Sequence, residues 1–179
     1  MPENTESQHQ SAKHLAARAV MAYRAGFPVA LLSVTSSGER PSGIVCDWKG
    51  RRDSFHNDEK LLGRAFAFVY IGSIMDQAIS DPISHELHKE LVSDMSSALE
   101  ARQTAVDWGV AEAVRDTNPY AHAGYKLASR LLRMDQPLIE SLARELTSQG
   151  TIEADALKKW LDGNASPLNF DELETSITY

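Results

Sequence analysis

Apolar and small residues recur at helical spacing over most of the chain, and glycines or prolines separate the runs. The alanine-rich run Ser11–Ala25 is expected to be a helix that stops at Gly26. A second helix should start at Asn57 or Asp58 and end at Gly72. Its run LLGRAFAFVYI is apolar nearly all round, which predicts a place in the middle of the fold.

Proline in the first turn marks three further helix starts, at Asp81-Pro82, Asn118-Pro119 and Gln136-Pro137. The first of these helices should be long and reach about Val114. The second covers AHAGYKLASRLL, and the third covers LIESLARELTSQ and closes at Gly150. A last short helix, ADALKKWL, should end at Gly163. The C-terminal part is therefore expected to be helical.

Strand patterns occur only near the start of the chain. Val29–Thr35 (VALLSVT) predicts a strand, and Gly43–Trp48 with Arg51–Phe55 could form a hairpin. We therefore expect a mainly α (α+β) fold, with a small N-terminal sheet beside the helices.

The composition allows one domain with a proper core, because the chain has 179 residues of which 42% are hydrophobic. We expect residues 11–163 to form this domain, between a disordered leader at 1–10 and a flexible acidic tail at 164–179. The net charge of −7 argues against a nucleic-acid or anionic-membrane partner.

The expected location is the cytoplasm. The single cysteine, Cys46, cannot form an internal disulfide, which fits a reducing compartment. The sequence shows no secretory signal, and no run approaches the roughly 20 apolar residues needed to cross a bilayer.

One carboxylate stands out in the long predicted helix. Asp94 lies in the middle of an otherwise apolar stripe formed by Leu87, Leu91, Asp94, Ala98, Ala101 and Ala105. An ionised carboxylate on a packed face is costly unless it is paired, hydrogen-bonded or bound to a metal. Asp94 therefore needs a partner, unless the helix is rolled so that Asp94 faces water.

Four segments, in this order, match segments of one enzyme family. HLAARAVMA begins at His14, and GFPV follows it before the strand; LGRA at Leu62–Ala65 precedes Ile71-Gly72; Ser93-Asp94-Met95 comes third; and KLASRLL with IESLARELTSQGTIEADALKKWL comes last. These segments resemble the zinc helix HEAGHALVA, the LAGRAAE…FG helix, the segment with the third zinc ligand and the C-terminal helical hairpin. The family is that of the FtsH-type ATP-dependent zinc metalloproteases, and the similarity is to its proteolytic domain.

The resemblance implies a zinc site that has lost the residues needed to bind zinc and to catalyse hydrolysis. Such a site needs two histidines one turn apart, and a glutamate after the first to take a proton from zinc-bound water. Here His14 keeps the first position, but Leu15 replaces the glutamate and Arg18 replaces the second histidine. Leucine accepts no proton, and a guanidinium repels a cation. His14 and Asp94 alone are too few ligands for a tight site. Phe66 and Phe68 also stand near positions where the family has acidic residues.

We therefore interpret the chain as a catalytically inactive FtsH-peptidase-like protein, a pseudoenzyme that needs no cofactor and acts as a binding or assembly module. Its partner would be another protein or a second copy, because the family's proteolytic domains form rings. The chain carries no ATPase module. We hypothesise that the Arg18 guanidinium replaces the zinc ion and forms a salt bridge with Asp94. The alternative for Arg18 is a solvated side chain.

Two other functions stay open. The first is an active metallopeptidase-type hydrolase, whose metal is held by His14 and Asp94 with an unidentified ligand, or by His85 and His88. Two histidines three apart on a polar helix face are more often solvated. The second is an unrelated helical adaptor. Cys46 is more simply a small buried residue than a nucleophile.

Overall fold

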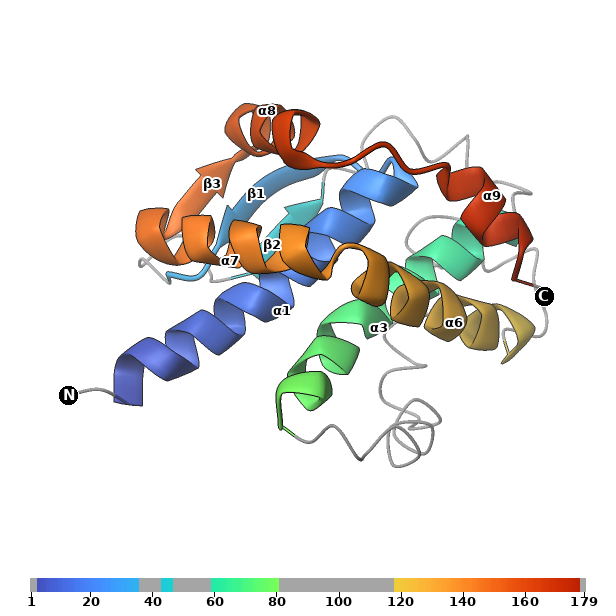
Figure 1. Ribbon diagram of the computed structural model, residues 1–179, viewed down its shortest axis with the longest axis horizontal. Helices are drawn as coiled ribbons and strands as arrows, with labels where there is room; N and C mark the ends of the chain where they lie inside the picture. The colour runs from blue at the N-terminus through green and yellow to red at the C-terminus, as the bar shows by residue number, and fades with distance from the viewer. Residues whose placement is uncertain (1–2, 36–42, 47–58, 81–117, 178–179) are drawn as a thin grey trace.

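The computed structural model describes residues 3–35, 43–46, 59–80 and 118–177. These ranges are mostly helical and include a small antiparallel sheet, as the sequence predicts (Figure 1). The helices are α1 (Glu3–Ala25), α3 (Glu59–Ser80), α6 (Asn118–Met134), α7 (Gln136–Gln149), α8 (Ala154–Asn164) and α9 (Phe170–Thr175). Among the described residues, no helix combines the length and the apolar character that crossing a bilayer requires.

Helix α1 runs through the middle of the molecule, and α7 crosses it (Figure 1). It contacts α3, α7 and β1. Its small residues are buried almost completely: Ala12, Ala16, Ala17, Ala19, Ala22 and Ala25. Because alanine projects only a methyl group, the neighbouring elements can approach the α1 backbone closely. The alanine-rich composition of this helix therefore reflects its central position.

Helix α3 is the second buried helix, as its apolar sequence predicts. The seven consecutive residues Ala65–Ile71 are each at most 6% exposed. Phe66 and Tyr70 stack with ring centroids 5.8 Å apart. Burial raises the pKa of Tyr70 to about 12. The aromatic residues Phe66, Phe68 and Tyr70 are core residues.

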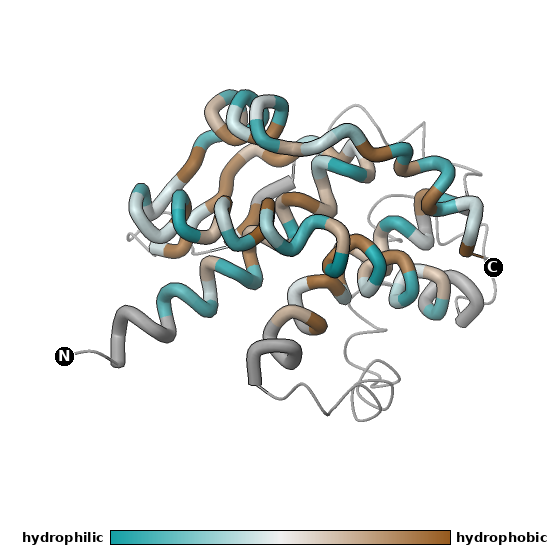
Figure 2. Tube along the Cα trace, viewed as in Figure 1, coloured by the Kyte–Doolittle hydropathy of each residue, from teal (hydrophilic) through white to brown (hydrophobic). Residues whose placement is uncertain are grey.

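The sheet has the strand order β2-β1-β3, with both pairings antiparallel. The central strand β1 (Val29–Ser33) pairs Leu32 with Ile44 of β2 (Gly43–Cys46) and with Ile152 of β3 (Thr151–Glu153). In the hydropathy view, β1 is hydrophobic along most of its length, whereas α7 and α8 alternate hydrophobic and hydrophilic positions (Figure 2). The sheet therefore adds an apolar surface next to α1.

Several boundaries differ from those expected. Helix α1 begins at Glu3, within the residues expected to be a disordered leader. Helix α3 does not end at Gly72 but continues to Ser80, because Gly72 serves close packing rather than termination. Strand β2 pairs with β1, and β3 was not predicted. The expected strand at 51–55 and the long helix at 81–114 lie outside the described residues.

The C-terminal tail is the main correction to the expected domain layout. Residues 164–179 were expected to be flexible, but α9 forms there and packs on the rest of the protein. Phe170 and Ile177 are buried, and Glu174 is 1% exposed. The tail is ordered because these two apolar anchors flank a carboxylate that pairs with Arg64.

The crossing of α3 and α6 depends on Gly124. A Cβ atom built on Gly124 would lie 2.5 Å from Phe66 Cβ, 2.8 Å from the Gly63 carbonyl oxygen and 2.9 Å from the Ala67 amide nitrogen. Two of these neighbours are backbone atoms of α3, which cannot rotate away. We predict that Gly124→Ala lowers the free energy of unfolding by about 1–3 kcal/mol, measured by urea denaturation.

Gly163 provides the matched control for this substitution. No atom lies within 4 Å of a Cβ built on Gly163, near the end of α8. Gly163→Ala should therefore be neutral or stabilise by up to about 1 kcal/mol, because alanine is the better helix former. Equal effects of the two substitutions would show that the α3–α6 crossing is not close-packed.

Candidate functional site on helix α1

His14 and Arg18, predicted from the family resemblance, lie one turn apart on α1 and face α3. The imidazole of His14 lies against Gly72: a Cβ atom on Gly72 would be only 2.5 Å from His14 Nε2 and 2.6 Å from Cε1. Any side chain at position 72 would overlap this ring. Because Gly72 has no side chain, the His14 ring can occupy this space against α3.

Arg18 contacts the next turn of α3. Its guanidinium carbon lies 4.5 Å from the centroid of the Phe68 ring, in cation–π geometry. Leu15, between His14 and Arg18 in sequence, is 9% exposed and belongs to the core. Position 15 is thus a packing position in this protein.

These contacts run antiparallel along the two helices. Four residues forward on α1, from His14 to Arg18, correspond to four residues backward on α3, from Gly72 to Phe68. Further along in the same antiparallel direction, Arg64 Nη1 of α3 donates to the Ala25 carbonyl oxygen at the end of α1, at 3.5 Å. Side chains of α1 and α3 therefore fill the face that the resemblance assigns to a metal.

The residues on this face do not fit the zinc site of the family. A tetrahedral catalytic site takes three protein ligands and a general base, but Leu15 and Arg18 supply neither. The described residues also contain no group of three His, Cys, Asp or Glu side chains that could hold a metal ion. The other predicted ligand positions, Asp94, His85 and His88, lie outside the described ranges. The Arg18–Asp94 pair therefore stays a prediction.

Three other residues of types that can bind a metal are Cys46, His9 and His122. Cys46 is the last residue of β2, and the structure does not describe its side chain. His9 Nδ1 lies 3.4 Å from Thr147 Oγ1, which connects α1 to α7. His122 is exposed on α6.

Two buried ion pairs were not predicted from the sequence. The first joins Arg24, in the last turn of α1, to Asp135, just before α7. Arg24 Nε and Nη2 each donate to one Asp135 carboxylate oxygen at 2.8 Å, and Nη1 donates to the Ser166 carbonyl oxygen at 2.9 Å. Both side chains are at most 10% exposed. The only sequence signal was an aspartate at a helix start, which is usually a cap.

The second ion pair joins Arg64 of α3 to Glu174 of α9. Arg64 Nε and Nη2 donate to the two Glu174 oxygens at 2.8 and 2.7 Å, and Nη2 also donates to Asp171 at 3.0 Å. The hydrogen bond from Arg64 to Glu174 raises the pKa of Arg64, although its desolvation opposes this. This bidentate geometry is the stronger form of an arginine–carboxylate pair.

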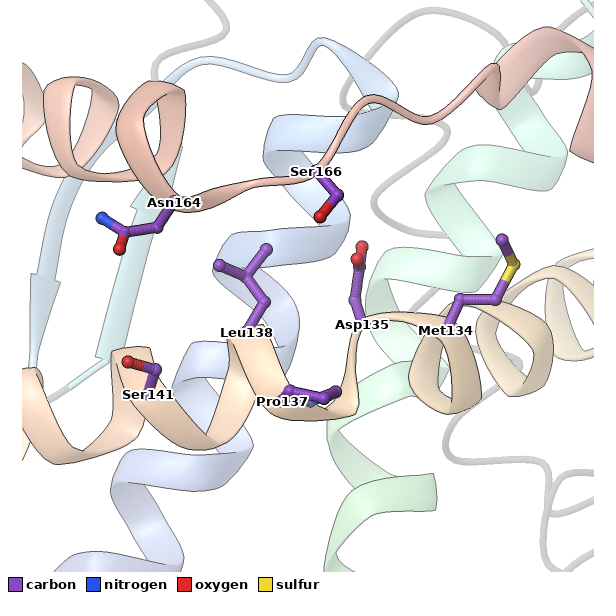
Figure 3. A pocket seen from close by; sticks show the side chains of 7 residues that line it. All are labelled: Met134, Asp135, Pro137, Leu138, Ser141, Asn164 and Ser166. Atoms are coloured by element: carbon purple, nitrogen blue, oxygen red, sulfur yellow. The ribbon is translucent and has the colours of Figure 1, made fainter.

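Two surface cavities flank these elements. One, of about 370 Å³, lies between the end of α1 and α8 and is lined mainly by apolar residues that include Phe27, Leu157 and Leu161. The other, of about 270 Å³, lies where α7 begins and the chain leaves α8. Figure 3 shows its lining, with the Asp135 carboxylate directed toward the segment that carries Ser166. The Asp135 carboxylate in this lining already accepts two hydrogen bonds from Arg24.

The contact between His14 and Gly72 can be tested with a double-mutant cycle. Gly72→Ala should lower the free energy of unfolding by about 1–3 kcal/mol, because the new methyl group overlaps the imidazole. In a His14→Ala background the same change should cost at least about 1 kcal/mol less. Chemical denaturation of the four proteins measures the coupling. Additive effects would mean that the ring does not occupy this space.

Comparison of the chain with models of protein families, with curated proteins and with solved structures found no match.

Proposed function

We propose that the protein is a catalytically inactive relative of the FtsH-type peptidase domain that acts as a binding or assembly module. One observation carries this proposal. On the α1 face where the family's helix binds zinc, Leu15 is part of the core and the Arg18 guanidinium lies over Phe68. A zinc hydrolase needs a base and a histidine at these two positions.

The arginine also gives a reason why such a fold would keep its shape without the ion. A guanidinium carries a permanent positive charge and five N–H donors in a planar fork. In the proposed arrangement, one part of this group stacks on Phe68 and its charge faces Asp94. The arginine would then compensate the carboxylate that the zinc ion compensates in the family.

A domain without these catalytic groups would act by binding other molecules at its surface. Two inter-element ion pairs, Arg24–Asp135 and Arg64–Glu174, support a rigid scaffold because each joins segments more than 100 residues apart. Rigid elements present a binding surface at a lower entropic cost than flexible ones. A binding or assembly role needs this property, whereas a substrate-processing role would also need the missing catalytic groups.

The proposal is tested by a zinc-dependence assay. The purified protein, supplied with zinc, should degrade an unfolded casein substrate no faster than the same sample with a chelator. It should also retain well below one zinc ion per chain after dialysis. His14→Ala is the matched control, because it removes the one retained histidine of the motif and should change neither result. One zinc ion per chain, together with chelator-sensitive cleavage that His14→Ala abolishes, would overturn the proposal.

A further inference from the structure

The Arg64–Glu174 pair belongs to a larger site that holds the end of the chain. We name it the Arg64 site and define it by Arg64, the Ala25 carbonyl group and Arg130. We name residues 169–177 the C-terminal segment. The residues of the Arg64 site come from the end of α1, the start of α3 and α6.

Four residues of the C-terminal segment contact this site. Glu174 receives two hydrogen bonds from Arg64 and is 1% exposed, and Asp171 receives a third. The Arg64 guanidinium carbon also lies 5.1 Å from the centroid of the Phe170 ring. Arg130 donates to the Ser176 hydroxyl group. The site therefore recognises a short acidic helix with an aromatic residue at its start.

No residue of α8, the helix that precedes the C-terminal segment, belongs to the Arg64 site. Residues 165–168 connect α8 to the segment, and Ser166 and Pro167 are exposed. One contact that holds this connection is the hydrogen bond from Arg24 to the Ser166 carbonyl oxygen. Ala165 and Leu168 of the connection also pack, partly buried, against the core. The segment can therefore leave the site when these two residues are released, while α8 keeps its place on β1 and β3.

We propose that the Arg64 site is a self-recognition site, which accepts the C-terminal segment of a second copy and so joins two chains by reciprocal exchange. This inference rests on the proposed assembly role, and the partner that it names is a second copy of the same chain. Each copy carries a segment that fits the site in charge and shape, because the segment already occupies that site within its own chain. Exchange of an identical element is a low-cost route to a dimer, since no new contact has to be formed.

The short connection explains why exchange needs either high concentration or a weakened internal contact. A short linker holds the segment at an effective concentration of roughly millimolar near its own site. Dilute protein is therefore closed and monomeric. Removing the internal competitor should shift association into the micromolar range.

A mixing experiment with full-length variants isolates this contact. Arg64→Gln has a damaged site and an intact segment, whereas the double variant Phe170→Ala with Glu174→Gln has an intact site and a damaged segment. Each alone should be monomeric at about 0.1 mM, because all copies of one variant lack the same half of the contact. A one-to-one mixture should form a two-chain complex, detected by light scattering and by native mass spectrometry. Circular dichroism establishes that each variant is folded.

Arg133→Gln is the matched control for Arg64→Gln. Arg133 is an exposed arginine of α6 whose Nε donates to the Ser129 carbonyl oxygen of its own helix. Mixed with the double variant, Arg133→Gln should remain monomeric, because its own segment still fills its own site. A mixture of the two folded main variants that stays monomeric would overturn the proposal. Equal association of each variant alone would overturn it too, because the contact would then not use the Arg64 site.

The wild-type protein provides a second test if Arg64→Gln does not fold. Its dimer fraction should rise as the concentration approaches about 1 mM, and the double variant should show no such rise. A wild-type protein that stays monomeric over this range, or a double variant that dimerises equally, would contradict exchange. Neither result depends on zinc or on proteolysis, so failure of this inference is distinguishable from failure of the proposed function.

Discussion

The antiparallel contact between α1 and α3 is the constraint on which the rest of the described structure depends. It is set by three meeting points: the His14 ring on Gly72, the Arg18 guanidinium on Phe68, and Arg64 on the carbonyl end of α1. Helix α7 and the sheet pack on α1, and α6 packs on α3. Because the interior is close-packed, a shift of one meeting point would displace the others. The candidate site is therefore also the centre of the fold.

Two arginine–carboxylate contacts add to the packing that joins the C-terminal half to this helix pair. Arg24 fixes the start of α7 through Asp135, and Arg64 fixes α9 through Glu174. Loss of one partner from such a buried pair typically costs about 3–5 kcal/mol, because the remaining charge is left without compensation. The two arginines sit at one end of the α1–α3 contact, far along the chain from both carboxylates. The two arginines therefore join the α1–α3 pair to segments that lie more than 100 residues away in the sequence.

The helices were predictable because their signals are local. Gly26 and Gly150 end α1 and α7 with φ angles of 74° and 75°, as a glycine stop requires. Gly72 has the same local signal but a different role, since only the opposite helix shows that its missing side chain accommodates His14. Strand β3 is three residues long and was too short to recognise. The order of the tail depends on a pair 110 residues apart, which no local pattern reveals. For the candidate site, the spacing placed His14 and Arg18 on one face, but it could not identify Phe68 as the partner surface.

The central claim is that a guanidinium on α1 has replaced a divalent cation opposite an aspartate. A double-mutant cycle on Arg18 and Asp94 measures this directly, with unfolding free energies for the wild type, Arg18→Ala, Asp94→Ala and the double variant. The account predicts that Arg18→Ala costs about 3–5 kcal/mol, and that most of this loss disappears when Asp94 is already alanine. A loss below about 1 kcal/mol for Arg18→Ala, the value typical of an exposed charge, would contradict it.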